Sequence, residues 1–217
     1  MSLELHGHPF ASFCQKVLIA LYENETPFSD VFVDLGDPTS RAAFLKLSPT
    51  GKMPVLRDVG RDQTVFETSI IIEYLNQYYP GRTALIPSAP DFAREVRLLD
   101  RFYDLYVSEP MQKVVADRLR PVGNGDPYGV NEAKAALRKA YAIIEERLGD
   151  RRWELGDAFS MAECSAAPAL HYADLVEPFG STFPRVSAYL QRLRDRPSYA
   201  RVVREAAPFA HLFPKEQ

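Results

Sequence analysis

The chain has 217 residues, of which 46% are apolar and 25% are charged, and its formal net charge at pH 7 is −3. This length is enough for one large domain or two small ones with a real core, and the composition is that of an ordinary globular protein. Because acidic and basic side chains nearly balance and form no basic stripe, we expect no nucleic-acid partner.

The chain contains two cysteines, Cys14 and Cys164. So few cysteines predict reduced thiols in a reducing compartment rather than a disulfide. The N-terminal residues MSLELHGHPF lack the basic start and apolar run of a secretory signal. No stretch approaches the roughly 18 uninterrupted apolar residues that a membrane span needs. We therefore expect a cytoplasmic protein that does not bind membranes.

The first 80 residues mix strand and helix patterns. Alternating or short β-branched and aromatic segments predict strands at residues 2–6, 28–33, 54–57 and 64–66. Apolar residues at helical spacing predict helices that contain residues 13–21, residues 40–47, and residues 71–79. The predicted order is therefore β-α-β-α-β-β-α.

Four turn-forming residues, Pro80, Gly81, Pro87 and Pro90, mark the next ten residues as a linker. Beyond the linker the sequence shows only helical patterns. The apolar faces expected in these helices are Leu98, Phe102 and Leu105; Leu137, Ala140, Tyr141, Ile144 and Leu148; and Val186, Tyr189, Leu190 and Leu193. The change from mixed α/β to all-α predicts two domains, residues 1–80 and residues 90–217.

Several motifs occur in a specific order along the chain. Gly51-Lys52-Met53-Pro54 opens a predicted strand, and Glu67-Thr68 precedes the apolar helix SIIIEYL. Ser160 and Glu163 form an S-x-x-E capping box ahead of an apolar helix. With the strand-helix start at residues 3–21 and the segments 159–170 and 196–202, this order resembles the cytosolic glutathione S-transferase family. The likeness is greatest to bacterial and other serine-dependent members, such as the theta, tau and zeta classes.

The resemblance implies a thioredoxin-like N-terminal domain that binds glutathione and a C-terminal helical bundle. It implies that Pro54 follows a cis peptide bond and that the backbone of Met53 pairs with the cysteinyl residue of glutathione. Glu67 and Thr68 would hold the γ-glutamyl end, at a helix N-terminus that favours an anion. Lys52 would reach the glycyl carboxylate.

Thr68 could instead be a plain N-cap, Met53 a core residue, and Lys52 an exposed turn lysine. Arg41 is an alternative partner of the glycyl carboxylate, although a solvated charge is the more common role for such an arginine.

The group that activates the thiol is less clear from the sequence. Lowering a thiol pKa by about two units is worth roughly 2.7 kcal/mol, which a hydroxyl donor together with a helix N-terminus could supply. The usual family position of that donor falls on Ala11, so we expect Ser12 to donate to the glutathione sulfur. Ser12 could instead only cap the helix, and the backbone N–H groups of residues 11–13 could stabilise the thiolate. Cys14, one turn further in, is the least favoured candidate.

The electrophile is expected to bind between the domains, near Phe10, Phe13, Tyr103 and Tyr106. Further candidates are Met111, Phe209 and Leu212, although aromatic residues at helical spacing are more often core residues. Asp100 and Arg101 could face a partner subunit or form a solvated pair. His6 and His8 have no third ligand nearby in sequence, so we expect no metal.

The resemblance predicts an enzyme, a glutathione transferase of detoxification type, that conjugates the glutathione thiolate to small hydrophobic electrophiles. Glutathione is the co-substrate, and no other cofactor is expected. The family usually forms homodimers, so a homodimer is expected here. Two alternatives remain open: a glutathione-dependent isomerase, lyase or dehalogenase on the same fold, and a non-catalytic glutathione-binding protein, which Ala11 keeps open.

Overall fold

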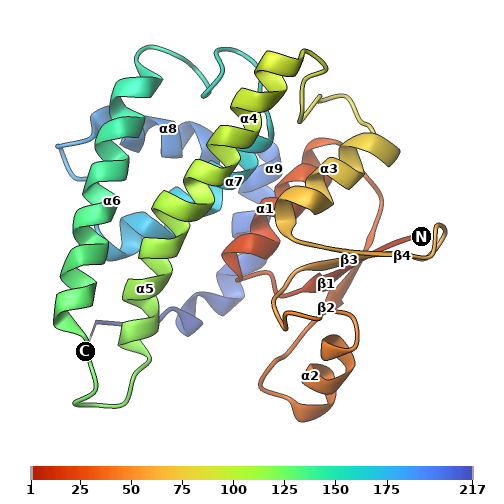
Figure 1. Cartoon of the computed structure of the whole chain (residues 1–217), viewed down its shortest axis with the longest axis horizontal. Coiled ribbons are helices and arrows are strands. Elements are labelled where there is room, and N and C mark those ends of the chain that lie inside the picture. Colours follow the sequence, from red (N-terminus) through yellow and green to blue (C-terminus); the bar gives the residue numbers. More distant parts are fainter. Residues whose placement is uncertain (1, 217) are drawn as a thin grey trace.

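The computed structural model describes residues 2–216, and its N-terminal part is a small α/β domain (Figure 1). The elements follow the order expected from the sequence. They are β1 (Leu3–Gly7), α1 (Ser12–Glu23), β2 (Ser29–Phe32), α2 (Pro38–Leu45), β3 (Val55–Asp58), β4 (Gln63–Phe66) and α3 (Thr68–Tyr78). This β-α-β-α-β-β-α arrangement is that of a thioredoxin-like domain.

The four strands form one mixed sheet in the order β2-β1-β3-β4. β1 pairs in parallel with β2 and antiparallel with β3, and β3 pairs antiparallel with β4. Along β1, Leu3 and Leu5 are buried while Glu4 and His6 are only half-buried, which is the period of two expected for a strand. The register places Gly7 beside Phe32 and His6 beside Val55, so the end of β1 lies between the end of β2 and the start of β3.

The C-terminal part is entirely helical, as the sequence predicts. Its elements are α4 (Pro90–Phe102), the π-helical segment η1 (Tyr103–Ser108), α5 (Glu109–Arg118), α6 (Pro127–Leu148), α7 (Met161–Val176), α8 (Pro184–Asp195), α9 (Pro197–Ala206) and the 3₁₀ segment η2 (Ala207–Leu212). α4, η1 and α5 form one long rod, with α6 running alongside it (Figure 1).

The N-terminal sheet domain and the helical domain share one core. α1 packs against α7 and α9, and the central cluster of buried residues runs from Leu3 and Val17 in the first domain to Leu170 and Tyr199 in the second. The domain boundaries at residues 80 and 90 therefore stay a prediction, because a shared core does not by itself say where the units separate.

The start of α7 is fixed by the predicted capping box. The Ser160 side chain accepts a hydrogen bond from Ala162 N–H, and the Glu163 carboxylate accepts one from Ser160 N–H at 2.7 Å. Glu163 is fully buried and also accepts from Tyr189. Burial raises the pKa of Glu163 to about 7, although hydrogen bonds from Glu154 N–H and Ser160 oppose the shift.

The predicted apolar face of the first long helix is wrong. Leu98 is 53% exposed and Leu105 is exposed, whereas the neighbouring face with Val96 and Tyr103 is buried. The reason is that Asp100 lies in the middle of the true core face, where a buried lysine pairs with it. Both cysteines are free, as predicted, and both are buried. None of the described helices is long and apolar enough to cross a bilayer.

Candidate glutathione site

A cavity of about 330 Å³ lies between the two domains. The N-terminal domain contributes residues from α1, from the loop before β3 and from the start of α3, and the helical domain contributes one face of the α4-η1-α5 rod. The lining residues are Phe13, Thr50, Lys52, Met53, Pro54, Phe66, Glu67, Thr68, Arg101, Asp104, Leu105, Glu109 and Gln112. Residues from three separate sequence motifs therefore meet in one hollow.

The loop before β3 presents its backbone to this cavity. The Met53–Pro54 peptide bond is cis, as the resemblance implies. Within residues 2–216, the N–H and C=O groups of Met53 have no hydrogen-bond partner. The loop itself is fixed, because the buried Ser48 hydroxyl donates to the Lys52 carbonyl at 2.9 Å. A rigid backbone with a free donor and a free acceptor is suited to pairing with an extended peptide.

The start of α3 is the second element of the cavity. Glu67 is the N-cap residue, with φ 67° and ψ 115°, a conformation that is costly for a residue with a side chain. Such a residue costs about 1–3 kcal/mol and is typical of functional sites. Its carboxylate is exposed and makes no capping hydrogen bond, while Thr68 is nearly buried as the first helical residue. Thr68 is therefore not the N-cap, which is a correction to the sequence interpretation.

The N-terminus of α1 is the third element. The N-cap is Ala11, which has no capping side chain, and Ser12 is the first helical residue. Ser12 is half-buried, and its hydroxyl has no partner within residues 2–216. It does not cap the helix, so it is available to a ligand. Its neighbour Phe13 lines the cavity, whereas Ser12 is not among the lining residues.

Cys14 lies one turn further into the same helix and is fully buried. Burial raises its pKa to about 12, even though the backbone N–H of His8 donates to its sulfur at 3.4 Å. A thiol with such a pKa is inert near neutral pH, because the thiolate is the reactive form. Cys14 therefore fills space beneath the site.

The helical domain adds a charged wall that the sequence analysis did not identify. Asp104 and Arg101 line the cavity, and behind them the buried Lys16 ammonium lies 2.9 Å from Asp104 and 2.6 Å from Asp100. Ser69, directly after Thr68, donates to Asp100 at 2.6 Å. Burial raises the pKa of Asp104, while Lys16 opposes the shift. This cluster ties the start of α3 to α1 and α4.

The predicted roles of Asp100 and of one tyrosine are corrected by these positions. Asp100 is fully buried, so it neither faces a partner subunit nor forms a solvated pair. Tyr103 is also fully buried and donates its hydroxyl to Glu154, so it cannot contact an electrophile in the cavity. Both residues lie on the core face of the rod. The sequence pattern instead places the core face at Leu98, Phe102 and Leu105.

The other predicted electrophile residues are spread over three places. Phe13 lines the cavity. Phe10 is half-buried and packs edge-on against Tyr172, whose hydroxyl donates to the Phe10 carbonyl at 2.7 Å. Tyr106 lies outside the cavity, in a separate groove of about 640 Å³ between the rod and α6. We call this second hollow the outer groove. It is lined by Phe102, Leu105, Tyr106, Glu109, Pro110, Lys113, Ala133, Ala136, Lys139, Ala140 and Ile143.

Three further candidates occupy distinct positions. Met111 is a core residue, and Arg41 is exposed on α2 and is not among the residues that line the cavity. Phe209 in η2 packs against His8 and Phe32, with ring centroids 4.7 and 5.9 Å away. No sequence pattern connects the rings of His8, Phe32 and Phe209, since they come from three distant segments.

A thioredoxin-like domain with a cis-proline loop, a strained residue before a helix and an all-helical partner domain defines a class of glutathione-binding proteins. Comparison of the sequence with known families agrees with this class. Residues 5–83 match the family model of the glutathione S-transferase N-terminal domain, and residues 127–192 match that of the glutathione S-transferase C-terminal domain. The chain belongs to the glutathione S-transferase family, which is a family of transferases.

Curated relatives and solved structures support the assignment. The chain is 27% identical over 210 residues to glutathione S-transferase F7 of Arabidopsis thaliana, covering 93% of this chain and 99% of the relative. It is 28% identical over 207 residues to a glutathione S-transferase of Pseudomonas putida, covering 93% and 91%.

Solved structures show the same fold. A glutathione S-transferase of Methylobacillus flagellatus, with GSH bound, has a TM-score of 0.84 at 22% identity, covering 93% of this chain and 98% of that one. The glutathione transferase URE2P6 of Phanerochaete chrysosporium, in complex with oxidised glutathione, has a TM-score of 0.85 at 21% identity, covering 96% and 98%.

Proposed function

We propose that the chain binds glutathione in the interdomain cavity and transfers its thiolate to a small electrophile. The observation that carries this proposal is that the Met53 backbone, the Glu67-Thr68 pair and the start of α1 meet around one cavity. Extended glutathione would pair its cysteinyl backbone with Met53, direct its γ-glutamyl group to Glu67 and Thr68, and place its glycyl carboxylate near Lys52. Glutathione is then a co-substrate, and the site needs no further cofactor.

The thiolate would lie at the N-terminus of α1. There the partial positive charge of the helix and the free Ser12 hydroxyl both favour the sulfur anion. Attack on an electrophilic carbon forms the C–S bond, and either a leaving group departs or the π electrons move onto an acceptor. Binding supplies the orientation of the two reactants, and the helix end supplies the lowered thiol pKa.

Titration calorimetry with glutathione tests the binding part. Glu67→Ala and Thr68→Ala should each weaken affinity by roughly 1–3 kcal/mol, because each leaves a charged group of the ligand without its partner. Glu132→Ala, at an exposed position of α6 that does not line the cavity, is a matched control and should leave the affinity unchanged. Unchanged affinity in both site variants would contradict the assignment.

A conjugation assay with a chloronitroaromatic electrophile tests the catalytic part. Turnover by the wild-type protein is expected. Retention on a glutathione-affinity column without turnover would instead identify a binding protein, the alternative that Ala11 at the N-cap favours. Turnover of a halogenated or isomerisable substrate alone would favour the other enzyme classes on this fold.

We also propose that two copies form a homodimer through the face that carries the outer groove. Tyr106 lines the outer groove and is exposed, and the apolar side chains of Ile70 in α3 and Leu98 in α4 are exposed as well. Apolar surface of this kind is typical of a protein interface. The two free, buried cysteines suit a reducing compartment, and we propose the cytoplasm and a role in detoxification.

A further inference from the structure

The loop that joins β1 to α1 is held by side chains from two helices. The Phe10 carbonyl accepts a hydrogen bond from the Tyr172 hydroxyl of α7 at 2.7 Å. The Pro9 carbonyl accepts one from the Gln15 side-chain amide of α1 at 3.0 Å. The same amide nitrogen donates to the Tyr172 hydroxyl at 3.0 Å, and both side chains are buried. One connected pair of buried side chains therefore holds two consecutive carbonyl groups of the loop.

The N–H ends of the same two peptide units are bonded as well. Phe10 N–H donates to His8 Nδ1 at 3.1 Å, and Ala11 N–H donates to the His8 carbonyl at 3.0 Å. Both peptide units that lead into the N-cap residue Ala11 thus have one partner at the oxygen and one at the nitrogen. Neither peptide plane can rotate without breaking a hydrogen bond.

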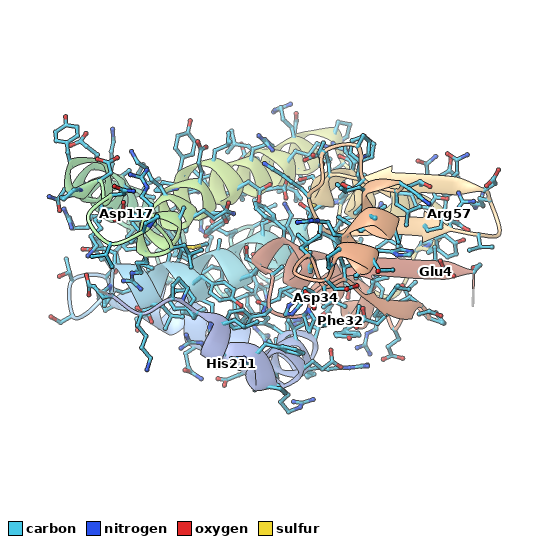
Figure 2. The ribbon with its side chains drawn as sticks, turned by 90° about the horizontal axis from the view of Figure 1, so that it is seen from below. Glu4, Phe32, Asp34, Arg57, Asp117 and His211 are labelled. Atoms are coloured by element: carbon cyan, nitrogen blue, oxygen red, sulfur yellow. The ribbon has the colours of Figure 1, made fainter. Side chains whose placement is uncertain are left out.

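Aromatic packing holds the Tyr172 ring in place. The ring stacks on Phe213, with centroids 5.9 Å apart and planes 18° apart, and it meets the Phe10 ring edge-on at 5.6 Å. Phe213 directly follows η2, the segment that carries His211 and lies beside Phe32 at the end of β2 (Figure 2). The hydroxyl is therefore aimed at the loop by rings from two other parts of the chain.

The Gln15 amide is held in one orientation. Its nitrogen donates to both Pro9 and Tyr172, whereas its Oε1 atom is buried and has no hydrogen-bond partner within residues 2–216. A buried acceptor without a partner costs stability, and such groups are rare in folded proteins. Burial raises the pKa of the Tyr172 hydroxyl, although the hydrogen bond from Gln15 opposes the shift, so the hydroxyl remains a donor in alkaline solution.

We propose that Gln15 and Tyr172 are positioning residues for the glutathione thiolate, because they hold two carbonyl oxygens of the loop against the core and away from the N-terminus of α1. The first N–H groups of a helix have no partner within it, and they stabilise an anion there. A carbonyl that is released can turn toward the sulfur, where its negative end raises the thiol pKa. This inference rests on the proposed function, since it needs the thiolate at the start of α1.

The thiol pKa of bound glutathione, measured by thiolate absorbance near 240 nm against pH, tests the inference. Tyr172→Phe keeps the stacked ring and removes only the hydroxyl. The thiol pKa should therefore rise by about 0.5–1 unit, and turnover of the chloronitroaromatic electrophile at pH 6.5 should fall about two- to tenfold. The Kd of glutathione should stay within about twofold. The loss of turnover should disappear near pH 9, where the thiol is largely ionised in both proteins.

Tyr199→Phe is the matched control. The Tyr199 hydroxyl is also buried and donates to a backbone carbonyl, that of Ala167 in α7, at 3.2 Å, but it makes no hydrogen bond to the loop within residues 2–216. The control should lose a similar amount of thermal stability while the thiol pKa stays unchanged. Gln15→Met releases the Pro9 carbonyl and should raise the thiol pKa in the same direction as Tyr172→Phe. It decides the question if Tyr172→Phe does not fold.

A raised thiol pKa in either site variant, with an unmoved Tyr199→Phe, supports the positioning role. An unchanged thiol pKa in both Tyr172→Phe and Gln15→Met, or an equal shift in Tyr199→Phe, overturns it while leaving the proposed function intact. If the wild-type protein does not bind glutathione in titration calorimetry, the proposed function fails and this inference fails with it.

Discussion

Lys16 is a buried cation whose removal should destabilise the fold strongly. Its ammonium is 1% exposed and lies 2.6 Å from Asp100 and 2.9 Å from Asp104, and it donates to the Ser69 hydroxyl at 3.2 Å. Lys16→Met keeps the length and apolar character of the stem and removes only the charge. The change therefore leaves two carboxylates between the domains without their cation.

Breaking a buried ion pair by removing one partner costs about 3–5 kcal/mol, because the remaining charge stays buried and uncompensated. For a protein of this size, each kcal/mol lowers Tm by about 2–4 °C, so Lys16→Met should lower Tm by about 6–20 °C. Asp104 retains some contact with solvent and with Arg101 at 3.8 Å, which places the expected loss toward the lower end.

Urea unfolding and thermal unfolding, followed by far-UV circular dichroism, measure the loss. The matched control is Arg97→Met, which breaks a bidentate pair with Glu73 on the surface, with contacts of 2.6 and 3.0 Å. Half-exposed pairs of this kind contribute about 0–1 kcal/mol. Adding Asp104→Asn to Lys16→Met should recover part of the loss, because it removes one of the stranded charges.

Equal losses of stability in Lys16→Met and Arg97→Met would refute the reasoning, because a buried cation and a surface cation would then contribute equally to the free energy of unfolding. A double variant less stable than the single one would also contradict it, since it would mean that the Asp104 charge is stabilising without Lys16.

Ser12→Ala should raise the thiol pKa of bound glutathione by about one to two units, and it should lower turnover at pH 6.5 about tenfold while the glutathione affinity is kept. The thiolate absorbance near 240 nm, measured against pH, gives this pKa. An unchanged thiol pKa in the variant would assign the role to backbone N–H groups. Burial raises the pKa of Asp58, but hydrogen bonds from Tyr79, Tyr74 and Arg61 N–H outweigh burial and hold that pKa below its usual value. Asp58 therefore stabilises the fold above about pH 4, and the stability gap between wild type and Asp58→Asn should close as pH falls through the folded pKa; a gap that persists at low pH would contradict this. Limited proteolysis should first cut within residues 80–90 or 123–129, and first cleavage inside α3 would count against the domain division. Sedimentation at micromolar protein should give twice the monomer mass of 24.5 kDa, and a monomer would contradict the dimer.

The order of elements in the N-terminal domain could be predicted because each pattern is local. Alternation along β1 and the four-residue spacing of Phe13 and Val17 report which side of an element is buried, and the turn residues separate one element from the next. The cis bond before Pro54 needed the family resemblance, since the isomer of an X–Pro bond is set by tertiary context.

The face of the first long helix could not be predicted for the opposite reason. Asp100 makes its core face look polar, and the lysine that neutralises it lies 84 residues earlier, in another domain. The same distance hides the contribution of Arg101 and Asp104 to the cavity, and it hides the cluster of His8, Phe32 and Phe209. Side chains that meet only after the domains dock leave no periodic signal in any one segment.

The π-helical segment η1 fixes how the side chains of α5 are rotated about the rod axis relative to those of α4. Each residue of an α-helix turns the chain by about 100°, whereas the wider turn at Tyr103–Ser108 takes up one more residue per turn, so α5 continues α4 without a large change of rotation. Deleting one residue there would let the segment relax to an ordinary helix with nearly the same total rotation, so Arg101 and Gln112 would both stay on the cavity side of the rod. Alignments of relatives across this segment should therefore allow a one-residue gap at η1, because a relative with an ordinary helix there presents the same side-chain faces with one residue fewer.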